Sequence, residues 1–244
     1  MLTQLSRFFE AEAERQRATP RQPRGCIAQL TMSFWLDFFH KQLFVKLPRP
    51  TADFSGQTVI VTGANVGLGR EAARQLVSLG AAKVILAVRD VKKGEDAAAE
   101  ILKSTKAISP VVEVWQVDLT NPASIDAFAE RVTTLDRLDA VIQNAGVSSP
   151  TYQLIGDTEM NFAVNTVGAT LLSLRVLPKL RESATKTGLP GRLTIVGSEA
   201  QRAVLAQDLQ TEGSIIDQVN NKNVKLGRQV LIPLHPSAFN KICR

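Results

Sequence analysis

The chain has 244 residues, of which 44% are hydrophobic, and this length suits one α/β domain with a substantial core. Its net charge of +6 comes from scattered lysines and arginines without interleaved aromatic residues, which argues against nucleic-acid binding. The two cysteines, Cys26 and Cys243, and the two histidines match no disulfide framework or metal-ligand spacing, so we expect no metal site.

The chain begins with a charged segment and a segment rich in aromatic residues. Residues 1–31 are polar and charged, and we predict that they form a disordered extension, with either Met1 or Met32 as the true start. Within 32–50 we predict an amphipathic helix, because 33–47 is apolar but too short and too charged to span a bilayer. Two roles stay open for it: packing on the domain surface, or peripheral contact with a membrane or partner.

A strand, a glycine-rich turn and a helix follow in order. The run from Thr58 to Thr62 has the β-branched composition of a fully buried parallel strand. Gly63 would let the chain turn out of the strand, Gly67 would let the backbone approach a pyrophosphate, and Gly69 would let the next helix pack closely. That helix, predicted from residue 70 to 79, would point its N-terminus at the phosphates. A purely structural loop of the same composition is the alternative.

Strands and helices then alternate along the chain. Further strands are predicted at 83–88, 111–117, 138–143 and 192–196, and helices at 91–103, from Pro122 onward, and at 154–181. Such alternation predicts a parallel sheet with helices on both faces. After Ser198 the pattern is lost.

The glycine segment points to one family. Its spacing is Gly-x-x-x-Gly-x-Gly after Thr62, and it resembles the cofactor loop of the short-chain dehydrogenase/reductases, in their retinol-dehydrogenase-like fungal branch. The resemblance implies a Rossmann-type doubly wound parallel sheet, with the last strands and helices incomplete in this chain. It also implies that six residues of the loop bind the cofactor: Gly63, Asn65, Val66, Gly67, Leu68 and Gly69.

Residue 89 is the main indicator of which cofactor is bound. Arg89 lies about twenty residues past the glycines, where an acidic residue favours NAD and an arginine favours the 2′-phosphate of NADP. We therefore predict NADP. The neighbouring Asp90 argues in the opposite direction, and a solvated arginine at the end of a strand is the alternative.

The family resemblance adds residues after the third and fourth predicted strands. Asp118, followed by Leu119, resembles the aspartate that contacts the adenine ring, with a helix-capping aspartate as the alternative. Asn144, Ala145 and Gly146 match the family's Asn-Ala-Gly, which lies against the adenosine ribose, although a plain turn would also use asparagine and glycine.

Two residues match the family's catalytic positions, and two others are missing. Asn165 resembles the asparagine whose backbone helps to hold a water molecule, and Ser198 resembles the serine that bonds the substrate oxygen. The family's general acid/base is a tyrosine with a lysine four residues later. The only tyrosine here is Tyr152, and Gly156 stands four residues after it. A truncated or mis-spliced gene product would account for these absences.

We thus predict four segments: a disordered extension at 1–31, an amphipathic helix at 32–50, an NADP-binding Rossmann-type domain at 51–221 and an atypical tail at 222–244. The resemblance implies an NADP-dependent oxidoreductase that acts on a hydroxyl or carbonyl of a hydrophobic small molecule, in secondary metabolism and in the cytoplasm. The alternative is an inactive nucleotide-binding protein or fragment. Oligomerisation stays open, because the usual dimer surface is incomplete.

Overall fold

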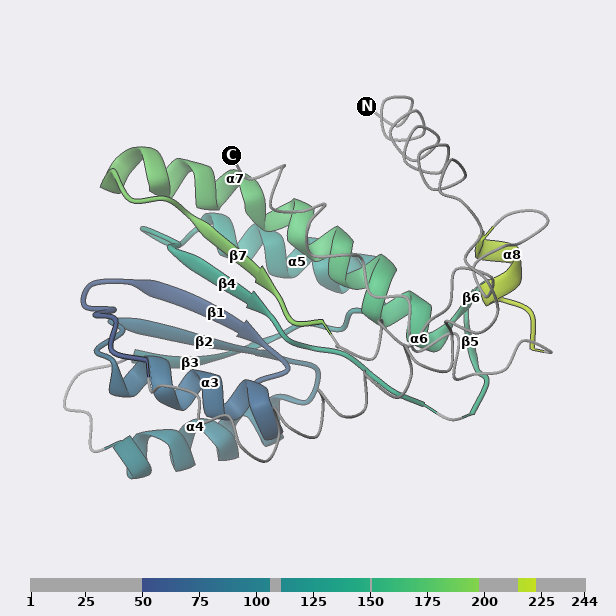
Figure 1. Cartoon of the computed structure of the whole chain (residues 1–244), viewed down its shortest axis with the longest axis horizontal. Coiled ribbons are helices and arrows are strands. Elements are labelled where there is room, and N and C mark those ends of the chain that lie inside the picture. The colour runs from purple at the N-terminus through teal and green to yellow at the C-terminus, as the bar shows by residue number, and fades with distance from the viewer. Residues whose placement is uncertain (1–49, 106–110, 150, 198–214, 223–244) are drawn as a thin grey trace, which may run out of the picture. The chain divides into compact units, whose positions relative to one another are not determined.

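Five parallel strands form the sheet, in the order β3-β2-β1-β4-β7 (Figure 1). The computed structural model describes residues 50–105, 111–149, 151–197 and 215–222. The strands are β1 (Thr58–Thr62), β2 (Lys83–Val88), β3 (Val111–Gln116), β4 (Ala140–Gln143) and β7 (Arg192–Ile195). The sheet grows from β1 to one side and then, after a switch in direction, to the other. This is a doubly wound order, so the predicted fold class is confirmed.

The first strand is central because it is buried along its whole length. All five residues of β1 are buried, and Val59 lies between its partners Val84 of β2 and Ala140 of β4. Side chains alternate along a strand, so Val59 and Val61 enter one core cluster while Ile60 enters the other. A run of β-branched residues suits this position, since parallel strands are covered on both faces.

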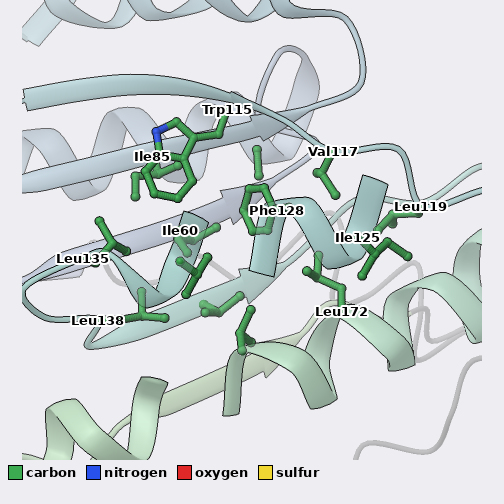
Figure 2. Close-up of a cluster of buried hydrophobic side chains, with 14 of the residues drawn as sticks. Ile60, Ile85, Trp115, Val117, Leu119, Ile125, Phe128, Leu135, Leu138 and Leu172 are labelled. Atoms are coloured by element: carbon green, nitrogen blue, oxygen red, sulfur yellow. The ribbon is translucent and has the colours of Figure 1, made fainter. Parts of the chain in front are cut away.

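Helices cover both faces of the sheet (Figure 1). They are α3 (Gly67–Ser78), α4 (Val91–Thr105), α5 (Pro122–Thr133) and α7 (Ala169–Thr187). The first two lie on one face and the last two on the other. Figure 2 shows the cluster beneath α5 and α7, where Trp115 meets the ring of Phe128 edge to face at 5.7 Å and Leu172 packs nearby.

The predicted helix at 154–181 begins later than expected and is preceded by a small hairpin. The elements are β5 (Leu154–Ile155), β6 (Thr158–Glu159), α6 (Met160–Phe162), the π-helix η1 (Ala163–Gly168) and then α7. The prediction was wrong for 154–159 because Gly156, with φ of +59°, turns the chain back on itself. A short helix, α8 (Ile215–Val219), contacts β6.

The long helix from Met160 to Thr187 is a core element. It is the one described helix that is long and apolar enough to cross a membrane, by length and composition alone. Its residues Leu172, Val176 and Leu180 are buried against the sheet, however, and core helices of soluble proteins pass the same test. The predicted extension at 1–31, nearly all of the predicted helix at 32–50 and the tail beyond Lys222 lie outside the described residues.

Candidate cofactor site

A cavity of about 690 Å³ lies at the carboxyl ends of the central strands. Open α/β sheets bind ligands at this edge, and the volume is within the range of ordinary ligand pockets. Loops after β1, β2, β3 and β4 all contribute to its wall. Eleven lining residues are the predicted ones, Gly63, Asn65, Val66, Gly67, Leu68, Arg89, Asp118, Leu119, Asn144, Ala145 and Gly146. The cavity therefore gathers nearly the whole predicted cofactor set.

The glycine loop leaves the N-terminus of α3 free to hold an anion. Gly63 and Gly67 have φ of +65° and +56°, which the tight turn out of β1 requires. Val66 is the N-cap residue of α3, and its side chain gives no hydrogen bond to the first helical N–H groups. The first turn contains no acidic residue either. These N–H groups and the positive end of the helix are therefore suited to a pyrophosphate.

Gly69 has a packing role and does not line the cavity. A Cβ atom at this position would lie 2.5 Å from the Asn144 amide nitrogen and 2.5 Å from the Gly63 carbonyl oxygen. Only a residue without a side chain lets α3 approach β1 so closely. The sequence predicts this close packing of the helix at Gly69. Its prediction that Gly69 also contacts the cofactor is not supported, because Gly69 does not line the cavity.

Thr62 ties the end of β1 to the loop after β4. Its hydroxyl oxygen accepts hydrogen bonds from the backbone N–H groups of Asn144 (3.0 Å) and Ala145 (2.8 Å). The Asn144 amide in turn donates to the Thr62 carbonyl at 3.0 Å. Three hydrogen bonds therefore fix the Asn-Ala-Gly segment against the end of β1, beside the glycine loop.

The loop after β2 and the first turn of α4 bring two cations and one acid to the cavity. Arg89 is exposed and lines the cavity, and its guanidinium has no ion-pair partner among the described residues. Asp90 accepts the backbone N–H of Lys93 at 3.2 Å, as a capping residue of α4 does, and its carboxylate lies 3.6 Å from the Lys93 ammonium. Lys93 lines the cavity as well. The carboxylate of Asp90 thus lies beside the ammonium of Lys93, on the first turn of α4.

Lys93 is a cavity residue that sequence reasoning missed. Its spacing of three residues from a helix-capping aspartate was a usable signal, because it places the side chain on the first turn of the helix, beside the cap. Other missed lining residues are mostly aliphatic: Ala87, Val88, Val117, Thr120, Val147 and Val164.

Asp118 organises the loop after β3 and does not cap the next helix. Its carboxylate accepts the backbone N–H (2.9 Å) and the hydroxyl (2.7 Å) of Thr120. The cap of α5 is Asn121 instead, which rules out the helix-capping alternative. Leu119 is buried. Its backbone packs against η1 at Gly168, where a Cβ atom would lie 2.1 Å from the Leu119 carbonyl oxygen.

Of the two predicted catalytic residues, the structure describes one. Asn165 is half-buried in η1, and its amide both accepts the Val147 N–H and donates to the Val147 carbonyl, each at 2.8 Å. It is therefore not a surface asparagine. Ser198 lies outside the described residues. Tyr152 is not among the cavity residues, and its hydroxyl donates to the backbone carbonyl of Asn220.

The residues fit a dinucleotide on structural grounds alone. A Cβ atom added to Gly67 would meet nothing within 4 Å, so backbone is open to a ligand there. The uncapped end of α3 offers N–H donors, and the exposed guanidinium of Arg89 offers a charged fork. The arrangement can bind an anionic ligand that extends from the end of β2 to the end of β4.

Comparison with known proteins supports this assignment. The family model described as short chain dehydrogenase matches residues 57–207. The short chain dehydrogenase/reductase dmxR8 of Cryptosporiopsis sp. is 42% identical over 189 residues, which cover 77% of this chain and 58% of the relative. The short chain dehydrogenase sol3 of Alternaria solani is 49% identical over 171 residues, which cover 69% and 59%. The chain thus spans a little over half of the length of these relatives.

Solved structures agree with the fold and the family. A metagenomic short-chain oxidoreductase in complex with NADP matches with a TM-score of 0.55 and 27% identity, covering 78% of each chain. A short chain dehydrogenase from Shigella flexneri complexed with NADP matches with a TM-score of 0.52 and 26% identity, covering 64% of this chain and 65% of the other. With its doubly wound sheet, its glycine cradle and a family match across most of the described residues, this chain belongs to the short-chain dehydrogenase/reductase family of oxidoreductases.

Proposed function

We propose that this chain binds NADP and takes part in the oxidoreduction of a hydroxyl or carbonyl group on a hydrophobic small molecule, in secondary metabolism. The observation that carries the proposal is the pair of cations, Arg89 and Lys93, on the wall of the cavity that the glycine loop forms. Family membership supplies the reaction class. The fungal relatives support the reaction class, and the NADP-bound solved structures support the cofactor.

The local charges favour NADP over NAD. Asp90 could bind the adenosine ribose of NAD, but its carboxylate accepts the Lys93 N–H and lies 3.6 Å from the Lys93 ammonium, so a positive charge stands beside this acid on the wall of the cavity. The Arg89 guanidinium is not committed to any acid among the described residues, so it is available to a 2′-phosphate. Charge-assisted hydrogen bonds of this kind contribute roughly 1.5–3 kcal/mol.

Each group in the cavity has a distinct part in the proposed reaction. The bound nicotinamide supplies or accepts the hydride. The N-terminus of α3 would hold the pyrophosphate, Arg89 and Lys93 would hold the 2′-phosphate, and the loop after β4 would bind the ribose. Ser198, from its family resemblance, would donate a hydrogen bond to the substrate oxygen. Asn165 orients the loop after β4 through both atoms of its amide.

A nucleotide-binding protein without catalysis is the second candidate. The observation that favours it is the position of Tyr152, the only tyrosine of the chain, whose hydroxyl is bonded to Asn220 and which does not line the cavity. The cradle would then serve ligand binding alone. A hydrophobic small molecule as partner, the absence of nucleic-acid partners, peripheral membrane contact through 33–47 and a cytoplasmic location all remain predictions from the sequence.

Arg89→Ala is expected to lower the preference for NADPH over NADH by about tenfold or more, since at least 1.5 kcal/mol of charge-assisted bonding is removed. Lys93→Ala should act in the same direction, because it also releases Asp90 toward the ribose. Dissociation constants for both cofactors follow from titration of cofactor fluorescence. Lys92→Ala is the matched control, because this exposed neighbour on α4 does not line the cavity. An unchanged preference in Arg89→Ala, or an equal change in Lys92→Ala, would contradict the assignment.

A further inference from the structure

Two asparagines from one helical segment hold the loop after β4. Asn165 bonds the N–H and the carbonyl of Val147, as described above. Asn161 repeats the arrangement at Ser149: its oxygen accepts the Ser149 N–H at 2.8 Å, and its nitrogen donates to the Ser149 carbonyl at 3.2 Å. The loop at 147–149 is thus bonded by side-chain amides in the way that a neighbouring strand would bond it.

The spacing of the two asparagines matches the spacing of their targets. Residues four apart on a regular α-helix are separated by about 6 Å along its axis, and the π-helical η1 between Asn161 and Asn165 makes this an upper bound here. Two residues of an extended chain cover about 6.6 Å, at about 3.3 Å per residue. Asn161 therefore reaches Ser149, and Asn165, one turn later, reaches Val147.

A buried carboxylate fixes the orientation of the Asn161 amide. Glu159 is fully buried, and one of its oxygens accepts the Asn161 amide nitrogen at 2.9 Å while the other accepts the Phe162 N–H at 3.0 Å. Because the nitrogen of Asn161 must face Glu159, its oxygen must face the Ser149 N–H. Asn220 continues the chain of bonds, since its amide oxygen accepts the Glu159 N–H at 2.8 Å.

We propose that Asn161 is a positioning residue of the cofactor site, and that it keeps the loop at 147–149 against the nicotinamide half of NADP. This role rests on the proposed function. Val147 lines the cavity at the end of β4, on the far side of β1 from Arg89 and Asp118. A cofactor whose 2′-phosphate lies at Arg89 must extend its other half toward this loop. Loss of Asn161 would free Ser149 and leave Glu159 with an unpaired buried oxygen.

The test compares two ligands that differ in how much of the cavity they use. The fragment 2′,5′-ADP carries the adenosine end of NADP and lacks the nicotinamide end. In Asn161→Ala we expect the dissociation constant for NADPH to rise about tenfold and that for 2′,5′-ADP to stay within about twofold, because Ser149, two residues past the cavity residue Val147, loses its amide partner while the adenosine end of the cavity is unchanged. Calorimetric titration of the full chain measures both constants.

Ser183→Ala is the control for a general loss of stability. It also removes a buried side chain that bonds a distant backbone N–H, that of Leu138 at 2.8 Å, but it lies outside the cavity wall. It should leave both dissociation constants unchanged. Amide hydrogen exchange adds a direct readout, since Asn161→Ala should speed exchange at Ser149 and leave Val147 protected by Asn165.

A double variant that exchanges the donor and the acceptor between residues 161 and 159 tests whether NADPH binding can be restored. Asn161→Asp alone places a carboxylate against Glu159 and should weaken NADPH binding at least as much as alanine does. Adding Glu159→Gln restores a donor to this contact, with the direction of the bond reversed, and keeps the Ser149 N–H bonded; the bond to the Ser149 carbonyl stays lost, so NADPH binding should recover in part. Equal losses for both ligands in Asn161→Ala, or no recovery in the double variant, would overturn the positioning role. If the wild type bound neither ligand, the proposed function would fail first and this role with it.

Discussion

Gly67→Val is expected to abolish NADPH binding while the fold survives. A Cβ atom at residue 67 would meet no protein atom within 4 Å, so the branched side chain would project into the space left for the pyrophosphate. The φ of +56° adds strain of about 1–2 kcal/mol for a residue with a side chain. We expect the dissociation constant for NADPH to rise at least about a hundredfold, which is about 2.8 kcal/mol.

Gly156→Val is the matched control for this variant. Gly156 also has a positive φ, +59°, and a Cβ atom there would also meet nothing within 4 Å. It lies in the hairpin of β5 and β6 and does not line the cavity. Both variants should therefore lose similar stability in thermal unfolding, and only Gly67→Val should lose NADPH. If the folded Gly67→Val protein bound NADPH as the wild type does, the cradle would have been assigned to the wrong ligand.

The chain of 244 residues is expected to show little or no reductase activity even when it is folded and loaded with NADPH. A positioned general acid contributes about 10²–10⁴-fold in rate, and the sequence contains no Tyr-x-x-x-Lys pair to provide one. Tyr152 cannot replace it, because its hydroxyl is bonded to Asn220 and it does not line the cavity. Ser198 can donate a hydrogen bond to the substrate, but without an adjacent base its hydroxyl does not deliver a proton near neutral pH.

The comparison that tests inactivity is with a repaired chain. In that chain, the segment of a fungal relative that carries Tyr-x-x-x-Lys would follow residue 222, and a second version would carry phenylalanine in place of the grafted tyrosine. NADPH oxidation is then assayed with a panel of hydrophobic aldehydes and ketones. We expect turnover only in the version with the tyrosine. Comparable turnover in the original chain would mean that another residue supplies the proton.

The sheet and the strand ends were predictable from sequence because they depend on local patterns. Each of the five predicted strands is present, with ends that differ by at most about two residues, since buried parallel strands are short runs of β-branched residues between turns. The beginning of α5 was predictable from Asn121 and Pro122, whose roles as N-cap and first helical residue are local. The carboxyl ends of parallel strands lie at the same edge of a sheet, so the loops that follow these strands were expected to line one cavity.

What sequence reasoning missed depends on contacts between distant residues or on very short elements. Strands of two residues, such as β5 and β6, are too short to show any periodicity, although the Gly156-Asp157 turn was a local sign of them. The spacing of Asp90 and Lys93 indicates that they can meet on the first turn of α4, but not that both side chains lie on the wall of the cavity. The bond from Asn161 to Ser149 joins a helix to a loop twelve residues earlier, and helical spacing alone does not indicate such a target.

The position of β7 has a practical consequence for protein engineering. Among the described strands β7 lies at one edge of the sheet, and none of its residues lines the cofactor cavity, because β4 stands between β7 and the glycine loop. An edge strand exposes backbone groups that can recruit another chain, and charged or proline side chains on such a strand block that pairing. Arg192 and Thr194 are exposed on β7. Among the described residues, a lysine at Thr194 would therefore place a charge on this edge without altering any residue that lines the cavity.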